Sequence, residues 1–142
     1  MTPKPFFHQI ARRFGATLLI GAAALAAWPA AQAATPAEML AGYTAQAGAP
    51  AQAARGQAFF TAKHGKEWSC ASCHGAVPTQ AGKHASTGKA IGALAPAFNA
   101  ERFTDAAKTE KWFRRNCNDV LGRECSAGEK ADLLAWLLTL TA

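Results

Sequence analysis

Hydrophobic positions in residues 34–142 recur at the three-to-four-residue spacing of helices, and nowhere alternate as they would in a half-buried strand. The first predicted helix begins with Thr35 as cap, Pro36 at the first helical position and Glu38 completing a capping box. Its apolar stripe includes Tyr43, and Gly48 ends it. This pattern predicts an all-α fold.

Three further helices are predicted downstream. One runs from about residue 50 to residue 62, with an apolar face that includes Gly56 and Phe60. Another is predicted to begin with Thr104 as cap and to end at about Asn116. The last begins with a second capping box at residues 126–129 and continues as a leucine-rich stripe. Between these helices, residues 75–100 contain so many glycines and prolines that we expect irregular structure there.

The first 33 residues are predicted to be a secretory signal peptide. Lys4, Arg12 and Arg13 give a basic start, and residues 16–27 form an apolar run. That run is too short to cross the roughly 30 Å of a bilayer's hydrocarbon core. The small-x-small sequence at residues 31–33 is a typical cleavage site. We therefore expect a single domain, residues 34–142, that is exported to the periplasm.

Removal of that segment changes the expected charge. The net charge of +6 falls to +3, because the segment contains three basic and no acidic side chains. No basic patch interleaved with aromatic side chains is present, so no nucleic-acid partner is expected. A mildly positive face could still bind an acidic protein.

The strongest chemical signal is the motif Cys70-Ala71-Ser72-Cys73-His74. Two thiols at this spacing can reach the two vinyl groups on one side of a porphyrin, and the adjacent histidine can then bind the iron. The motif predicts one covalently attached haem c with His74 as proximal ligand. A thioredoxin-like pair would need a preceding strand, and a four-cysteine zinc site would need a second close pair.

Cys117 and Cys125 are eight residues apart and remain after the motif is assigned. Unpaired thiols seldom persist in an oxidising compartment, so a disulfide that closes a short loop is the default expectation. Such a loop contributes on the order of 2–3 kcal/mol of stability in the chain-entropy description. The disulfide could be a simple staple, or it could fix the residue beside Cys117.

The sixth ligand of the iron is not obvious from the sequence. Electron-transfer cytochromes c usually supply a methionine sulfur, yet Met1 and Met39 both precede the motif. The position could be empty, could take Met39 from an unusual direction, or could take another downstream side chain: His84, a lysine, Asn99, Asn116 or Asn118. A solvated loop histidine and helix-capping asparagines are the ordinary explanations for these residues.

Short segments along the whole domain carry a family resemblance. Among them is Arg115-Asn116-Cys117-Asn118; the others are residues 41–43, 47–50, 55–56, 69–70, 73–75, 87–89, 102–105, 110–112, 122–123, 125 and 128–137. In these segments the chain resembles the oxygen-binding cytochromes c of the SHP (sphaeroides haem protein) type. The resemblance implies a class I cytochrome c fold around one haem.

The resemblance also implies residue roles. Asn116 would be the sixth ligand of the ferric haem, beside a Cys117–Cys125 disulfide, and would leave on reduction. Small ligands such as O₂, NO or cyanide would then bind the open ferrous iron. A neutral, hard amide oxygen favours Fe(III) over the softer Fe(II), so this behaviour is chemically reasonable. The implied electron donor is a di-haem cytochrome c, with a membrane cytochrome b further upstream.

Two other functions remain open. The protein could be a plain electron shuttle with a different, permanent sixth ligand. It could also be a reductase of small oxygen or nitrogen oxides, although no general acid or base can be singled out for turnover. A haem protein that transfers electrons and binds ligands is therefore favoured over a dedicated enzyme. We expect a monomer or a weak dimer.

Overall fold

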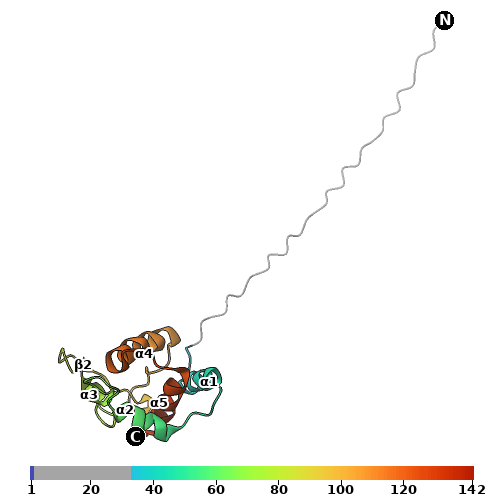
Figure 1. Ribbon diagram of the computed structural model, residues 1–142. Coiled ribbons are helices and arrows are strands. Elements are labelled where there is room, and N and C mark those ends of the chain that lie inside the picture. Colours follow the sequence, from blue (N-terminus) through green and yellow to red (C-terminus); the bar gives the residue numbers. More distant parts are fainter. Residues whose placement is uncertain (2–32) are drawn as a thin grey trace. The chain divides into compact units, whose positions relative to one another are not determined.

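Five α-helices dominate the part of the chain that the structure, a computed structural model, describes: residue 1 and residues 33–142. They are α1 (Pro36–Ala47), α2 (Ala53–Thr61), α3 (Ala71–His74), α4 (Ala106–Leu121) and α5 (Ala127–Thr139) (Figure 1). The predicted all-α fold is confirmed. The signal peptide prediction falls almost wholly outside the described residues. Within them, no helix is long and apolar enough to cross a membrane.

The two predicted capping boxes are present. The Thr35 hydroxyl accepts from the Glu38 backbone N–H at 3.1 Å, and the Glu38 carboxylate accepts from the Thr35 N–H at 2.7 Å. Ser126 and Glu129 make the same reciprocal pair at 3.2 and 2.8 Å. Each box satisfies backbone donors that would otherwise be unpaired at a helix start. Gly48, at φ 65°, ends α1 in the left-handed conformation that suits glycine.

The predicted bounds of α4 were wrong at both ends. Asp105, not Thr104, is the cap, because its carboxylate accepts from the Lys108 N–H at 2.9 Å. The Thr104 hydroxyl instead donates to the Glu101 carbonyl. The helix passes Asn116 and ends at Leu121, where Gly122 adopts a φ of 74°. Asn116 is therefore an interior helical residue and not a cap, which leaves its amide free for another role.

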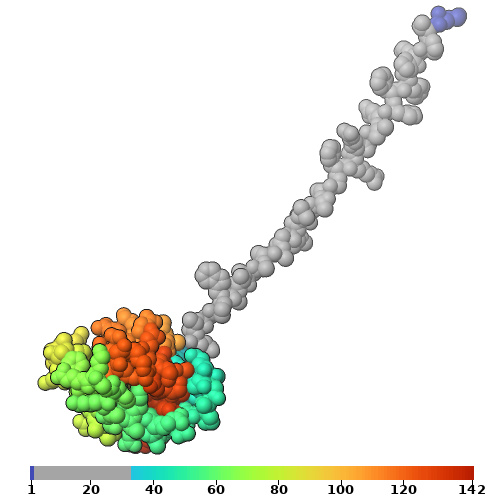
Figure 2. Space-filling view, in the orientation of Figure 1, coloured from blue at the N-terminus to red at the C-terminus, as the bar shows by residue number. Residues whose placement is uncertain are grey.

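Between α3 and α4 the chain is mostly irregular, as predicted. It contains a pair of two-residue strands, β1 (Gly82–Lys83) and β2 (Ala90–Ile91), and a single 3₁₀ turn, η1 (Pro96–Phe98). The strands are antiparallel, with Gly82 opposite Ile91. In the space-filling view, this segment (yellow) and α1 (cyan) lie on opposite sides of α4 (orange) (Figure 2).

The crossing of α2 and α5 is the tightest contact between helices. A Cβ at Gly56 would collide with the backbone of Asp132 and Leu133, so only glycine allows this approach. One turn further along α2, Phe60 is fully buried and its ring lies 5.0 Å from that of Trp136. The second helix begins at Ala53, three residues later than predicted, so Gly56 lies in its first turn.

An ion pair between the exposed Arg55 and the buried Asp132 fixes the same crossing. The Asp132 carboxylate accepts from the Gln52 backbone N–H at 2.6 Å and from two nitrogens of Arg55 at 2.6 and 2.8 Å. Burial raises the pKa of Asp132, but these hydrogen bonds outweigh burial and hold the pKa below its ordinary value. The charged carboxylate therefore stabilises the junction between α2 and α5 at neutral pH.

Substitution of Gly56 tests the helix crossing. Gly56→Ala should lower the free energy of unfolding by about 2–3 kcal/mol, because the added methyl group must force α2 and α5 apart. Gly42, on the exposed face of α1, has no atom within 4 Å of an added Cβ. Gly42→Ala should therefore stabilise the holoprotein by about 0.5–1 kcal/mol. Denaturant unfolding of wild type and both variants measures these free energies of unfolding. An equal change in the free energy of unfolding in Gly56→Ala and Gly42→Ala would contradict the close approach of α2 and α5.

Substitution of Asp132 tests the ion pair and its pH dependence. Asp132→Asn should cost about 1–3 kcal/mol at pH 7, because Arg55 loses its charged partner. A carboxyl whose folded pKa is lowered stabilises above its unfolded pKa, and loses that contribution as pH falls through the folded value. The difference from wild type should therefore narrow below about pH 4. Glu124→Gln, in an exposed pair with Arg114, should change stability by less than about 0.5 kcal/mol.

Candidate functional site

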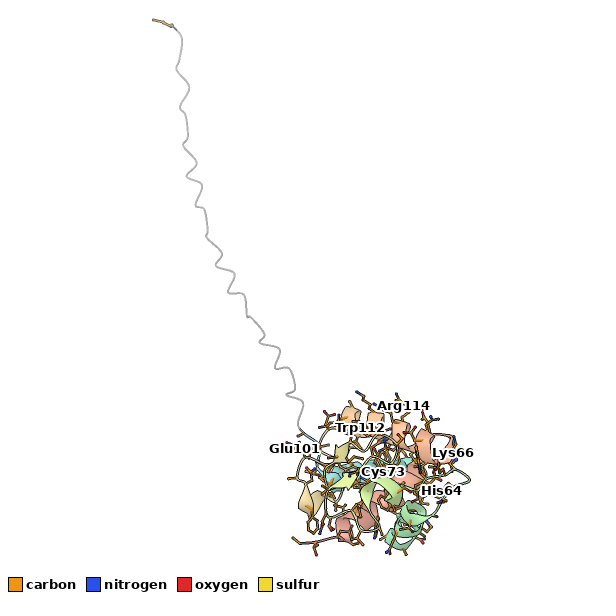
Figure 3. The ribbon with its side chains drawn as sticks, turned by 90° about the vertical axis from the view of Figure 1, so that its left-hand side faces the viewer. His64, Lys66, Cys73, Glu101, Trp112 and Arg114 are labelled. Atoms are coloured by element: carbon orange, nitrogen blue, oxygen red, sulfur yellow. A yellow bond between two sulfur atoms is a disulfide. The ribbon has the colours of Figure 1, made fainter. Side chains whose placement is uncertain are left out.

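A cavity of about 330 Å³ lies in the centre of the domain, within the range of cofactor pockets. Its walls come from distant parts of the sequence: the α2–α5 crossing, the Cys70–His74 motif, the loop from residue 91 to residue 105, and α4. Most of the lining surface is apolar. Figure 3 draws the side chains of the domain as sticks, with Cys73 and Trp112 labelled near the middle of the domain.

The motif forms its own short helix on one wall. Cys70 lies at the start of α3, and Gly75, at φ 79°, ends it directly after His74. Neither Cys70 nor Cys73 is in a disulfide, and both line the cavity. The Ala85 backbone N–H donates to the Cys73 sulfur at 3.3 Å. Both thiols are therefore available for thioether bonds on the same side of the cavity.

Burial sets the protonation of the motif side chains. Burial, and in second place the positive charge of Arg102, lower the pKa of His74 to about 4. The imidazole is therefore neutral at pH 7, the form that can bind a metal. Burial also raises the pKa of the Cys70 thiol to about 11 in the chain before any covalent attachment.

The core holds His74 in place. The Phe60 ring, buried against Trp136 of α5, lies 6.3 Å from the His74 imidazole. On the other side, Gly82 packs so closely against the backbone of Cys73 and His74 that an added Cβ would collide with the Cys73 carbonyl. The helix crossing and β1 therefore fix the position of the predicted proximal ligand.

Another wall is one face of α4. Thr109, Trp112, Phe113, Asn116 and Val120 recur at helical spacing, and all line the cavity. Asn118 is not among the lining residues. The charged side chains of Lys108 and Asp119 also contribute to this wall. α4 thus brings the amide of Asn116 to the same cavity as the motif helix.

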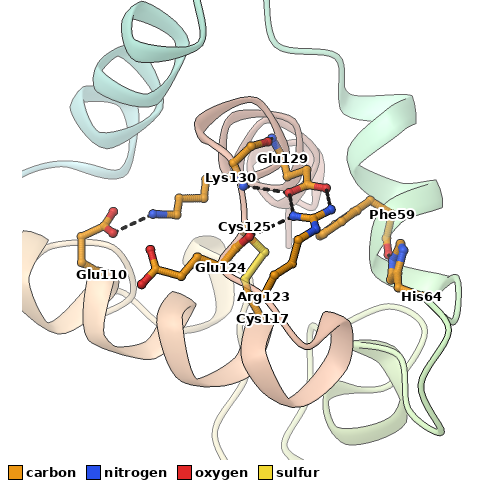
Figure 4. Close-up of a disulfide and its surroundings, with 10 residues drawn as sticks. Phe59, His64, Glu110, Cys117, Arg123, Glu124, Cys125, Glu129 and Lys130 are labelled. Atoms are coloured by element: carbon orange, nitrogen blue, oxygen red, sulfur yellow. Dashed lines mark hydrogen bonds and ion pairs between the residues drawn. A yellow bond between two sulfur atoms is a disulfide. The ribbon is translucent and has the colours of Figure 1, made fainter.

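Two attachments fix α4 to the rest of the domain. The first is a disulfide between Cys117 and Cys125, with a Cα–Cα distance of 5.6 Å, which ties α4 to the start of α5 (Figure 4). The second is a polar cluster in which Glu110 accepts from the Tyr43 hydroxyl at 2.6 Å and from the Lys130 ammonium at 2.7 Å. The Glu110 cluster joins α4 to both α1 and α5.

Charge stabilises the Glu110 cluster. Burial raises the pKa of Glu110, but the hydrogen bonds from Lys130 and Tyr43 outweigh it and lower the pKa overall. Lys130 also lies over the rings of Tyr43 and Phe113, at 5.5 and 5.6 Å from their centroids. Because Phe113 lines the cavity, this cluster supports the α4 wall from behind.

The candidate sixth ligands are not equally placed. Met39 packs against the core and is not among the cavity-lining residues. Asn99 lines the cavity, but its amide nitrogen donates to the Ala93 carbonyl and its oxygen accepts from the Glu101 N–H. The Asn116 side chain makes no hydrogen bond to any described residue. Of the two asparagines on the wall, Asn99 and Asn116, only Asn116 therefore has an uncommitted amide.

His84 is also on the cavity wall, contrary to the solvated position that a polar loop predicts. Its Nδ1 accepts from the Thr87 backbone N–H at 3.3 Å and lies 3.2 Å from the Ser86 hydroxyl. This engagement leaves Nε2 without a partner among the described residues. Among the histidine and asparagine candidates on the wall, His84 and Asn116 are therefore the two that could bind a metal without losing an existing contact.

These features fit a covalent haem. Two unpaired thiols and a neutral imidazole come from one short helix, and the cavity beside them is large and mainly apolar. A zinc centre does not fit, because Cys117 and Cys125 are bonded to each other and the described residues contain no group of three or more potential metal ligands. A helical shell around such a motif is the arrangement of c-type cytochromes.

Comparison with known proteins agrees with this class. A family model described as a domain of unknown function, DUF1924, matches residues 46–137. The "Cytochrome c-type protein SHP" of Cereibacter sphaeroides is 57% identical over 107 residues, which cover 72% of this chain and 82% of that protein. The structure of oxidized SHP, described as an oxygen-binding cytochrome c, matches with a TM-score of 0.71 and 54% identity, over 76% of this chain and 99% of that one.

A second relative is cytochrome c'' of Methylophilus methylotrophus, 50% identical over 90 residues, or 61% of this chain and 62% of that protein. Its solution structure, whose subject includes haem-ligand detachment, matches with a TM-score of 0.64 and 42% identity, over 75% of this chain and 94% of that one. The chain therefore belongs to the SHP family of c-type cytochromes, as its sequence segments indicated, and it carries one covalently bound haem c.

Sequence reasoning missed three contributors to this site. Glu110 and Lys130 were not recognised as partners, because they lie on different helices twenty residues apart and no local spacing links them. Arg102 lines the cavity from an irregular loop whose path no periodicity predicts.

Removal of the disulfide should destabilise the domain and loosen α4. Cys117→Ala/Cys125→Ala should lower the free energy of unfolding by about 2–3 kcal/mol, because the unfolded chain regains the entropy of a short closed loop. Denaturant unfolding of the haem-loaded protein measures this. Wild type treated with a thiol reductant is the matched control, since it loses the bond but keeps both side chains. A loss of less than about 0.5 kcal/mol in both samples would contradict the prediction.

Proposed function

We propose that this protein is a periplasmic cytochrome whose haem is held by Cys70, Cys73 and His74, and whose Asn116 acts as a reversible sixth ligand. Asn116 binds the ferric iron and leaves on reduction, so that a small molecule such as O₂, NO or cyanide can take its place. The bound haem supplies a one-electron redox centre and an iron coordination site. The observation that carries the proposal is that Asn116, whose amide makes no hydrogen bond to a described residue, lines the same cavity as His74.

The relatives support the proposal in general terms. SHP is described as an oxygen-binding cytochrome c, and work on cytochrome c'' concerns detachment of a haem ligand. Both properties require a sixth position that can open. This chain lacks a methionine downstream of the motif, so a strong sulfur ligand cannot close that position permanently from there.

The chemistry of the amide supplies the redox gate. An amide oxygen is a neutral, hard donor and binds Fe(III) better than the softer Fe(II). Reduction therefore weakens the attachment of Asn116, and oxidation restores it. No proton transfer is needed, because the amide does not titrate, so the gate responds to the electron alone.

The anchoring of α4 limits how Asn116 can move. Cys117, the next residue, is tied to Cys125, and Glu110 holds the earlier part of the helix against α1 and α5. With the helix fixed, release of the amide requires rotation of the side chain and not displacement of α4. The ligand stays near the iron and can return when the electron leaves.

Electron supply completes the proposal. We expect the electron donor to be another cytochrome, a di-haem cytochrome c with a membrane cytochrome b upstream, in keeping with the sequence resemblance and with the signal peptide. The protein would act as a monomer or weak dimer. Dedicated reductase chemistry gains no support, because no described residue can be singled out as its general acid or base.

His84 supports one alternative. Its free Nε2 faces the same cavity, and an imidazole binds both ferric and ferrous iron well. If His84 were the sixth ligand, the protein would be a permanently six-coordinate electron shuttle. The two assignments predict opposite results for the reduced protein, and so they can be separated by one set of spectra.

Asn116→Ala, His84→Ala and Asn118→Ala form a matched set for this test. Asn116→Ala should change the ferric spin state and raise the affinity of ferric protein for cyanide about tenfold, because the internal competitor is lost. Its ferrous carbon monoxide affinity should stay near wild type, because the amide has already left in that state. His84→Ala and Asn118→Ala should leave both states unchanged.

Absorption spectra and ligand titrations of the purified holoprotein measure these effects. Ferrous wild type that does not respond to carbon monoxide would overturn the redox gate. An altered ferric spectrum in His84→Ala, together with an unaltered one in Asn116→Ala, would transfer the ligand role to His84.

A further inference from the structure

Arg102 occupies an unusual position for a charged side chain. It is partly buried in the loop between η1 and α4 and lines the same cavity as His74. Its Nε donates to the Ala93 carbonyl at 2.8 Å, and its Nη2 donates to the Gly92 carbonyl at 2.8 Å. The guanidinium is therefore held rigidly at the cavity edge by the backbone of its own loop.

Arg102 makes no direct ion pair in the described chain, whereas Arg55, Arg114 and Arg123 each do. The carboxylate of the adjacent Glu101 acts on Arg102 through its field but forms no salt bridge with it. The Nη1 atom of Arg102 has no hydrogen-bond partner among the described residues. Burial lowers the pKa of Arg102 more than the charge of Glu101 raises it. A partly buried, unpaired cation beside an apolar cavity is costly and calls for an anion.

The surrounding loop is built to keep this guanidinium in place. A Cβ at Gly92 would lie 3.3 Å from the Asn99 amide nitrogen and 3.8 Å from Arg102 Nη2, so glycine leaves room for both side chains. Phe103, the next residue, is buried and adopts a φ of 61°, which is rare outside glycine. The strained backbone sends Phe103 into the core while Arg102 remains at the cavity edge.

We propose that Arg102 binds a carboxylate of a haem propionate. A covalent haem brings two carboxylates into a cavity whose wall otherwise offers few cations, and the planar fork of a guanidinium matches a carboxylate well. Lys108 also lines the cavity, but it is exposed and lies on the first turn of α4. Arg102 is partly buried and pre-positioned by two carbonyls, so it provides the stronger and more specific contact. This inference rests on the haem itself and not on the identity of the sixth ligand.

The pairing should control the reduction potential and its pH dependence. A propionate held by Arg102 keeps a low pKa and stays ionised, with its charge balanced, across the range near neutral pH. Without Arg102, the propionate charge is uncompensated and favours the ferric state, and its pKa rises. The reduction potential should then fall, most strongly at the alkaline end of the range, where the propionate is fully ionised.

Redox titrations of the holoprotein from pH 5 to pH 8 test this proposal. Arg102→Gln should have a lower potential than wild type at pH 8, with a difference that shrinks towards pH 5. Arg102→Lys keeps the charge and should lie closer to wild type at every pH. Lys108→Gln is the control for loss of a cation on the same cavity, and its difference from wild type should not change with pH.

Other charged groups face this cavity and must be accounted for. They are Glu101 and Asp105 in the same loop, Lys108 and Asp119 on α4, and His84 in the hairpin. All except the substituted residue are unchanged in each variant, so their contributions cancel in the difference from wild type. The ferric absorption spectrum recorded in the same titrations reports the sixth ligand separately, which distinguishes failure of this proposal from failure of the Asn116 assignment.

Two outcomes would overturn the propionate contact. One is an Arg102→Gln potential that runs parallel to wild type across the pH range, which would reduce Arg102 to a distant charge or a loop staple. The other is an Arg102→Lys potential that differs from wild type as much as the Arg102→Gln potential does, which would show that the positive charge does not set the potential. If Arg102→Gln does not accumulate, Arg102→Lys is compared with wild type alone. A small pH-dependent difference then supports the contact, because a single ammonium cannot reproduce the fork of the guanidinium, and equal potentials at every pH overturn it.

Discussion

The structure depends on the close approach of α2 and α5 at Gly56. Because Gly56 has no side chain, the backbones of the two helices touch, and Asp132 can bind both Arg55 and the start of α2. Phe60 is thereby buried between Trp136 and His74. A steric feature at one glycine thus sets the position of the imidazole on the wall of the central cavity.

The second requirement is a wall that faces His74 and does not collapse towards it. Helix α4 meets this requirement through two attachments of different chemistry, a disulfide at Cys117 and the polar cluster at Glu110. Neither attachment uses the Asn116 amide. A fixed helix that carries an uncommitted amide is well suited to the reversible ligand that we propose.

The electrostatics of the site follow from burial. The same apolar surroundings keep His74 neutral and make the unpaired charge of Arg102 costly. A neutral imidazole can bind iron, and a partly buried guanidinium without an ion pair can bind a carboxylate. Burial thus gives both side chains the properties that the proposed haem contacts need.

The sequence by itself determined the local features: the two capping boxes, the all-α class, the attachment motif and the family. Each of these depends on residues a few positions apart, where helical geometry or a covalent motif fixes the relation between side chains. The sequence placed the end of α4 too early, because an asparagine beside a cysteine resembles a helix cap when no tertiary contact is known.

Only the tertiary structure decided which side chains share the cavity. His84 was expected in solvent and lies on the wall, Asn118 lies off it, and Arg102 and Glu110 had no local signal at all. The physical reason is that these relations join irregular loops and separate helices, where neither periodicity nor propensity specifies a path. Contacts between distant parts of the chain are fixed by packing around the central cavity, and that cavity forms only when the helices pack against one another.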